Sequence, residues 1–196
     1  MNDSRDMSLF EVEVPETKPE TEWVRGRPLQ KMSPTYDQAT MQRLLTKELA
    51  DWAEAGRYGR VAPGWHGRYG RVAPGWRFRV APPDDIVRPL VPDIAYLSYD
   101  VLPEDAPREA LQVPIGTPTV AVEIVSSAAS RLDLHDKIVT YLEAGAEAII
   151  VVDLKSETVE VHDGITSVLA AGDILTHCAL PGFALDVGAL FAKLRA

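Results

Sequence analysis

The chain has 196 residues, 46% of them hydrophobic, which is enough for one domain with its own core. Its formal net charge of -9 argues against a protein that coats nucleic acid non-specifically, because such affinity comes largely from Lys and Arg. One cysteine excludes a disulfide within the chain, and no apolar run is long enough to span a membrane, so we expect a cytoplasmic protein with no membrane partner.

The N-terminal region is predicted to contain an arm, a hairpin and a helix. Residues 1–20 are polar, acidic and contain proline, so we expect a flexible arm ahead of a single domain at residues 21–196. Residues 23–32 fit a short strand or hairpin that turns at Arg25-Gly26. Ser33-Pro34 then opens a helix that ends at Gly56. Its helical spacing is set by the apolar residues Met41, Leu44, Leu45, Leu49 and Trp52.

An 11-residue segment is duplicated in tandem at residues 56–77. GRYGRVAPGWH is followed at once by GRYGRVAPGWR, and only the last position differs. Two copies of this length are too few and too short for a solenoid, which needs at least about three longer repeats. We therefore expect one copy to form a strand of the fold and the other to bulge out as a loop or an added hairpin. The sequence does not decide which copy does which.

The duplicated segment is also rich in arginine and aromatic residues and contains no acidic residue. Basic groups interleaved with aromatic rings suit a nucleic-acid backbone and its unstacked bases. The candidate nucleic-acid-binding residues are Arg57, Arg60, Arg68, Arg71 and Arg77. The alternative is that these arginines pair with the excess acidic residues of the chain and that the aromatic rings fill the core.

The second half of the chain is predicted to alternate strands with one long helix. Strands are expected at residues 76–82, 91–98, 119–125, 148–153, 157–162 and 165–170, the last two joined by a turn at Asp163-Gly164. Residues 100–117 are expected to form a loop, residues 131–144 a helix that stops at Gly145, and residues 185–194 a closing helix. Cys178 is expected to be buried near the end of a strand.

The run from residue 119 to residue 153 reads as strand, helix and strand, which is typical of a βαβ unit. The remaining strands come in hairpins. Together these predict an α/β fold with a central mixed β-sheet, flanking helices and added hairpins.

Glu123 is the most informative polar residue, because it lies inside the otherwise apolar stretch TVAVEIV. An unpaired carboxylate is costly to bury, so an acid there normally has a charged partner or a metal ion. Alternation places Glu123 on the same strand face as Ala121. Asp133, Lys137 and Tyr141 share one face of the following helix. Lys137 can therefore point toward Glu123, and we expect Asp133 and Tyr141 to support the site from behind.

Asp93, which follows Pro92 at the start of a predicted strand, is the second candidate carboxylate. Together with Glu123 it would hold a hard divalent cation, Mg²⁺ or Mn²⁺. Such a cation polarises a phosphoryl oxygen and activates a bound water, and Lys137 would stabilise the developing negative charge. These three residues are the minimum that phosphodiester hydrolysis needs.

The order VPD, AVEIVSS, RLDLHDKIVTYLEAG and AIIVVDLKSETVEVH resembles the Uma-two family. This bacterial group of endonucleases is part of the PD-(D/E)XK nuclease superfamily. The resemblance runs from about residue 22 to residue 194. It implies a restriction-endonuclease-like fold, a Mg²⁺ or Mn²⁺ cofactor, DNA as the substrate and a homodimer.

The family pattern implies a role for individual residues. The aspartate after proline and the glutamate of the E-V-x-S strand are the expected metal ligands, which here are Asp93 and Glu123. The superfamily places lysine two residues after that acid, where this chain has Val125, so the catalytic lysine is expected on the next helix at Lys137. Glu22 of EWVRG resembles the family's early acid and is expected to be an auxiliary ligand. The histidine that members often carry at the start of the first helix is missing from SPTYDQAT.

Two other hypotheses remain open at this point. One is a catalytically inactive module of the same fold that binds nucleic acid or another protein, which the acidic pI of about 4.9 and the missing histidine favour. The other is a structural subunit in which the acids and the lysine form only an ion-pair network.

Overall fold

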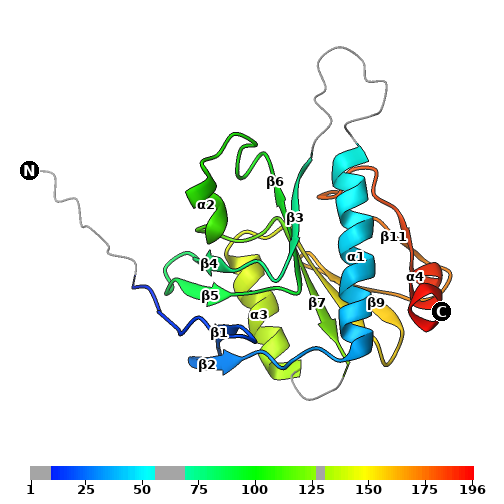
Figure 1. Ribbon diagram of the computed structural model, residues 1–196, viewed down its shortest axis with the longest axis horizontal. Coiled ribbons are helices and arrows are strands. Elements are labelled where there is room, and N and C mark those ends of the chain that lie inside the picture. The colour runs from blue at the N-terminus through cyan, green and yellow to red at the C-terminus, as the bar shows by residue number, and fades with distance from the viewer. Residues whose placement is uncertain (1–9, 56–68, 127–130) are drawn as a thin grey trace, which may run out of the picture.

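A six-stranded mixed β-sheet forms the centre of the computed structural model, which describes residues 10–55, 69–126 and 131–196 (Figure 1). The strand order is β10-β9-β8-β7-β6-β3, and every neighbouring pair is antiparallel except β7 and β8. The strands are β3 (Gly70–Pro74), β6 (Ile94–Ser98), β7 (Val120–Val125), β8 (Ala148–Asp153), β9 (Thr158–His162) and β10 (Thr166–Leu169). The predicted α/β architecture with a central mixed sheet is therefore confirmed.

The single parallel pair is joined by helix α3 (Arg131–Glu143), which confirms the predicted βαβ unit. Two parallel neighbours cannot be joined by a tight turn, so the chain must cross over one face of the sheet. The helix stops at Gly145, whose φ of 97° lies in the left-handed region that glycine adopts without strain. Ile138 and Tyr141 of α3 pack on the face of β7 that carries Ala121.

Two apolar layers cover the two faces of the sheet. On one face Val122, Ile124 and Ile150 pack against α1 (Tyr36–Ala55) and α4 (Val187–Arg195). On the other face Ala121 and Ile149 pack against α3. In the described part of the chain, no helix combines the length and apolarity that a bilayer crossing requires.

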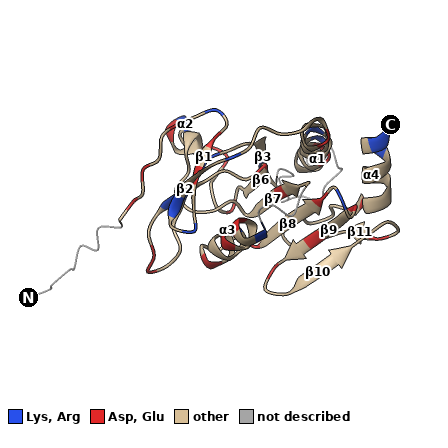
Figure 2. Cartoon of the chain, turned by 90° about the horizontal axis from the view of Figure 1, so that it is seen from below, with Lys and Arg blue, Asp and Glu red and all other residues tan. Residues whose placement is uncertain are grey.

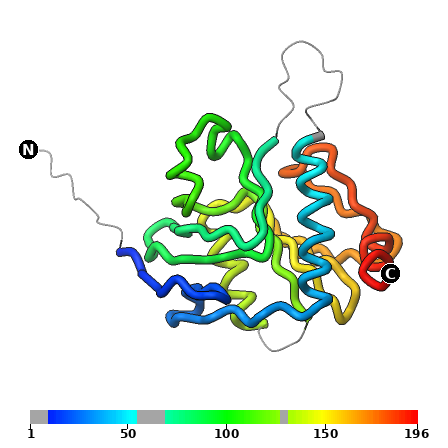
Figure 3. Tube along the Cα trace, viewed as in Figure 1, coloured from blue at the N-terminus to red at the C-terminus, as the bar shows by residue number. Residues whose placement is uncertain are grey.

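Three small antiparallel pairs complete the fold. They are β1 (Thr21–Val24) with β2 (Arg27–Gln30), β4 (Phe78–Val80) with β5 (Arg88–Leu90), and β11 (Ile174–Leu175) with β12 (Leu185–Asp186). The β1–β2 hairpin is the one predicted at residues 23–32, and it lies beside α3, far from α4 (Figure 3). It carries one residue of the candidate site, and a second follows it directly.

Two regions differ from the sequence predictions. The expected loop at residues 100–117 contains the short helix α2 (Arg108–Gln112), which buries no residue and has too few apolar positions to show a helical period. Residues 10–20 of the expected flexible arm are tied to the domain. Glu11 forms a parallel backbone β-bridge with Val87, and the Glu20 carboxylate pairs with Arg77. Residues 1–9 lie outside the described residues.

The second copy of the duplicated segment supplies strand β3, at the edge of the central sheet. The first copy, at residues 56–66, lies outside the described residues. Gly70 is the position where the close packing of β3 on β6 requires glycine. A Cβ there would lie 2.6 Å from Cε2 of Tyr96 and closer still to the carbonyl oxygen of Leu97.

The duplication offers a matched pair of variants that tests which copy forms the strand. Gly70→Ala should lower the free energy of unfolding by about 1–3 kcal/mol, because the methyl group overpacks the contact with Tyr96 and Leu97. Gly59→Ala makes the same change at the equivalent position of the first copy and should have a much smaller effect. Chemical denaturation of both variants measures the difference. The reverse order of effects would mean that the first copy forms β3.

Candidate active site

Five charged side chains from separate parts of the chain meet beside β7. We call Glu22, Lys31, Asp93, Glu123 and Lys137 the acid–lysine cluster. Glu22 lies in β1, Lys31 directly after β2, Asp93 directly before β6, Glu123 in β7 and Lys137 in α3. The three residues predicted to carry the chemistry, Asp93, Glu123 and Lys137, are thus brought together with the predicted auxiliary acid.

Glu123 faces α3 because side chains alternate along β7. Its neighbour Ala121 packs on the same face against Ile138 and Tyr141 of α3. Only 7% of the Glu123 side chain is exposed, and its Oε1 lies 2.6 Å from Nζ of Lys137. The predicted orientation of Lys137 toward Glu123 is therefore confirmed.

Glu22 holds the other side of the Lys137 ammonium. Its Oε1 and Oε2 lie 2.9 Å and 3.2 Å from Nζ of Lys137. Oε1 also accepts a hydrogen bond of 2.7 Å from the backbone N–H of Val91. Both carboxylate oxygens of Glu22 are thus committed to protein partners, and Lys137 is fixed between two buried acids.

Asp93 occupies the outer part of the cluster, with 22% of its side chain exposed. Its Oδ2 accepts a hydrogen bond of 2.7 Å from the backbone N–H of Ile124, next in sequence to Glu123. Gln42 of α1 donates from Nε2 to the backbone carbonyl of Asp93 at 2.7 Å. These contacts fix the Asp93 carboxylate beside the backbone of β7.

Lys31 is the member of the cluster that sequence reasoning missed. Its Nζ lies 2.6 Å from Oδ1 of Asp93 and 4.0 Å from Oε2 of Glu123, and it donates to the carbonyl of Val91 at 2.9 Å. A charged residue after a hairpin is usually a solvated one, so nothing in QKMSP marks it. Its importance comes from where the hairpin packs.

Two amide side chains of α1 contact the site. Gln38 donates from Nε2 to the carbonyl of Ile124 at 3.4 Å, and Gln42, one turn later, reaches Asp93. The helix therefore contacts both strands of the site through neutral side chains. No imidazole is supplied from this helix.

Burial and charge act in opposite directions on the ionisable groups of the cluster. Burial raises the pKa of Glu123 to about 7, although the ammonium groups of Lys137 and Lys31 lower it. Burial would lower the pKa of Lys137 and of Lys31, but the neighbouring carboxylates, Glu123 foremost, raise both above their ordinary value. Burial, together with the same negative charges, raises the pKa of Tyr141 well above its usual range. Both lysines therefore remain cationic.

The donor chemistry of the cluster fits Mg²⁺ or Mn²⁺ with only two protein ligands. Asp93 and Glu123 offer carboxylate oxygens, and Asp93 is reachable from solvent. In the described part of the chain, no group of three or more His, Cys, Asp or Glu side chains is arranged to hold a metal ion. Mg²⁺ typically takes one or two carboxylates and completes its coordination with water and substrate phosphate, so two ligands suffice.

The two predicted supporting residues occupy different environments. Asp133 pairs with Arg27 at 3.2 Å and with Arg25 at 3.7 Å, and so ties the basic β1–β2 hairpin to the acidic helix α3 (Figure 2). Tyr141 is fully buried, and its hydroxyl has no hydrogen-bond partner among the described residues. Asp133 thus fixes the hairpin that carries Glu22, whereas Tyr141 forms part of the apolar wall behind Glu123.

The two candidate nucleic-acid-binding arginines that the structure describes have partners within the chain. Arg71 donates to the carbonyls of Leu102, Pro103 and Glu104 at 2.8 Å each. Arg77 pairs with Glu20 at 2.8 Å. Arg57, Arg60 and Arg68 lie outside the described residues, and a role in nucleic-acid binding stays a prediction.

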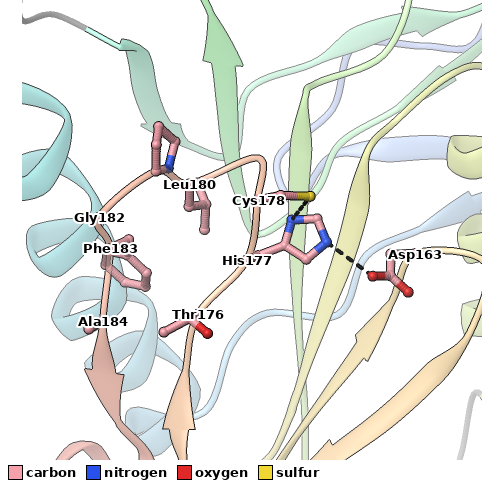
Figure 4. Close-up of a pocket in the computed structure, with 9 residues that line it drawn as sticks. Asp163, Thr176, His177, Cys178, Leu180, Gly182, Phe183 and Ala184 are labelled. Atoms are coloured by element: carbon pink, nitrogen blue, oxygen red, sulfur yellow. Dashed lines mark hydrogen bonds and ion pairs between the residues drawn. The ribbon is translucent and has the colours of Figure 1, made fainter.

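An open hollow of about 700 Å³ lies elsewhere, between the β9–β10 turn and the loop after β11 (Figure 4). His177 connects Asp163, at 3.2 Å from its Nε2, with the thiol of Cys178, at 3.9 Å from its Nδ1. Cys178 is exposed, which corrects the prediction that it is buried, because strand β11 ends before it at Leu175. No residue of the acid–lysine cluster lines this hollow.

Comparisons with known proteins agree with this fold. The model of the Uma2 family, described as "Putative restriction endonuclease", matches residues 8–188. A solved structure from Anabaena variabilis, described as "a putative nuclease belonging to DUF820", is similar with a TM-score of 0.75 and 20% sequence identity. The similarity covers 92% of this chain and 94% of that chain. No curated protein matches.

Removing the lysine at the centre of the buried acids should destabilise the fold. Lys137→Met leaves Glu22 and Glu123 buried without a cation between them, and should lower the free energy of unfolding by about 3–5 kcal/mol. Lys193→Met, which removes an exposed pair with Glu48, should cost less than about 1 kcal/mol. Chemical denaturation measures both.

A double variant separates the contribution of the Lys137–Glu123 ion pair to stability from the contribution of the packed lysine side chain. Lys137→Met with Glu123→Gln should lose less stability than the sum of the two single variants, because the second change removes the uncompensated charge. Equal effects of Lys137→Met and Lys193→Met would contradict the buried arrangement.

Proposed function

The chain belongs to the Uma2 family of restriction-endonuclease-like proteins, and we propose that it is a divalent-metal-dependent endonuclease that hydrolyses phosphodiester bonds of DNA. The Anabaena variabilis protein described as a putative nuclease has the same fold. Mg²⁺ or Mn²⁺ is the proposed cofactor. DNA is the proposed substrate, as the family description implies.

The observation that carries the proposal is the convergence of Asp93, Glu123 and Lys137. The residues come from three separate parts of the chain, yet Asp93 accepts a hydrogen bond from the backbone next to Glu123, and Glu123 is paired with Lys137. Burying this much charge is expensive, and a hydrophobic core would be cheaper to build. Two carboxylates and a fixed ammonium are what metal-assisted phosphoryl chemistry needs.

A bound divalent cation would supply a polarised phosphoryl oxygen and an activated water. Asp93 and Glu123 would hold it, and the backbone N–H of Ile124 orients the Asp93 carboxylate for that role. Lys137 has both sides of its ammonium fixed, by Glu22 and by Glu123, so its positive charge is preorganised. In this arrangement Glu22 acts through Lys137, and a direct contact of Glu22 with the metal stays a prediction.

The DNA contacts and the assembly remain predictions from the family resemblance. A homodimer would place two such sites against the two strands of a duplex. The net charge of -9 means that DNA affinity must come from local basic groups rather than from the chain as a whole.

An inactive module of the same fold is the competing hypothesis, and one observation favours it. Every carboxylate of the acid–lysine cluster has a lysine within 4.0 Å, so each of these acids already has a cationic partner within the chain. In that case Asp93 and Glu123 would be structural, and the protein would bind nucleic acid or another protein without cleavage.

Cleavage assays with matched variants distinguish the two hypotheses. Incubated with plasmid and single-stranded DNA plus Mg²⁺ or Mn²⁺, the wild type should cut, and Asp93→Asn and Glu123→Gln should each lose at least about 100-fold in rate. Glu160→Gln makes the same chemical change on β9, two strands from β7, and should retain activity. Chelation of the metal should abolish cleavage.

The competing outcomes are equally specific. Metal-independent DNA binding without cleavage would support the inactive module. Neither binding nor cleavage, with strong destabilisation of Asp93→Asn and Glu123→Gln, would support a purely structural ion-pair network. Thermal unfolding of each variant is measured beside its activity so that a folding defect is recognised.

A further inference from the structure

Lys31 lies beside one carboxylate oxygen of Asp93 and one of Glu123. Its ammonium contacts Oδ1 of Asp93 at 2.6 Å and stands 4.0 Å from Oε2 of Glu123. The other oxygen of each carboxylate has a different partner: Oδ2 of Asp93 accepts from the backbone N–H of Ile124, and Oε1 of Glu123 pairs with Lys137. The two oxygens left for a metal ion are those nearest to Lys31.

The two lysines of the cluster differ in how firmly they are held. Lys137 is 7% exposed and lies between two buried carboxylates. Lys31 is 21% exposed and is anchored by Asp93 and by the carbonyl of Val91. Lys31 stands on the short connection between β2 and α1, so its flexible four-carbon stem can move without disturbing a strand or a helix. Lys31 is therefore the more exposed of the two lysines and has one carboxylate in close contact, whereas Lys137 has two.

An ammonium and a divalent cation cannot use the same carboxylate lone pairs at once. If both lay beside the same carboxylate, their positive charges would repel each other. We propose that Lys31 is the resident counter-cation of the metal-free site, and that a divalent cation binds Asp93 and Glu123 only by displacing the Lys31 ammonium. This inference rests on the proposed metal-dependent function. It makes Lys31 a positioning residue, which holds the carboxylates together without metal and sets how tightly the metal binds.

Metal affinity measured by calorimetry with Mn²⁺ alone tests the competition without any cleavage readout. Lys31→Met keeps the stem and removes the charge, so it should bind Mn²⁺ at least about tenfold more tightly than the wild type. Lys31→Arg keeps the charge and should stay close to the wild-type affinity. Lys155→Met, at an exposed lysine in the β8–β9 turn, makes the same change in net charge and should leave the affinity unchanged.

The displacement itself has a spectroscopic signature. In lysine-selective ¹⁵N spectra, the Nζ resonance of Lys31 should shift or broaden on addition of Mg²⁺, because the ammonium loses its hydrogen bond to Asp93. The resonance of Lys137 should keep the protected character of a buried ammonium. Assignment uses the Lys31→Met and Lys137→Arg variants, and it requires only that the wild type is folded.

The outcomes separate this inference from the proposed function. Tighter binding by Lys31→Met, with a Mg²⁺-dependent change at Lys31, supports the displacement. Equal or weaker binding by Lys31→Met, while Asp93→Asn abolishes binding, overturns it and leaves the metal-dependent function standing. Absence of Mn²⁺ binding in the wild type and in Lys31→Met overturns both. If Lys31→Met does not fold, Lys31→Gln replaces it, and an unchanged Lys31 resonance overturns the inference.

Discussion

The buried ion pair between Glu123 and Lys137 is the constraint on which the rest of the site depends. A carboxylate in the middle of an apolar strand must be compensated, and α3, which packs on this face of β7, supplies the Lys137 ammonium 2.6 Å from Glu123. Lys137 also pairs with Glu22. Because Glu22 lies in β1, this pair holds the β1–β2 hairpin against α3. The position of the hairpin thus follows from the charge of a strand residue far away in sequence.

The same constraint brings residues to the site that have no pattern of their own. Once Glu22 is fixed, the chain leaves β2 next to Asp93, and Lys31 falls within reach of its carboxylate. Two aspartates of α3 reinforce this placement. Asp136 accepts a hydrogen bond from the backbone N–H of Arg25, and Asp133 pairs with the Arg27 side chain. The hairpin is therefore held by charges on both of its ends, and its geometry is part of the site.

The sequence predicted what local periodicity determines and missed what packing between distant segments determines. The period-2 pattern of β7 and the helical period of α3 were enough to place Glu123 and Lys137 face to face. Proline before Asp93 marked a strand start, and the order of the motifs identified the family. Lys31 and Gln42 carry no comparable signal, because their partners come from segments about 50 to 90 residues away along the chain.

The arrangement of charge in two tiers explains how a site of this kind can be both stable and open to a metal ion. The inner tier is the pair of Glu22 and Lys137, whose side chains are almost inaccessible to solvent. The attraction between the two charges offsets the cost of removing them from water. The outer tier, Asp93 with Lys31, is about one fifth exposed, so water can stabilise either partner when the pair separates. Glu123 belongs to both tiers, because one of its oxygens faces each lysine. Replacement of the Lys31 ammonium by a metal ion would therefore change the charge beside Glu123. The pair of Glu22 and Lys137 would stay in place and keep the fold intact.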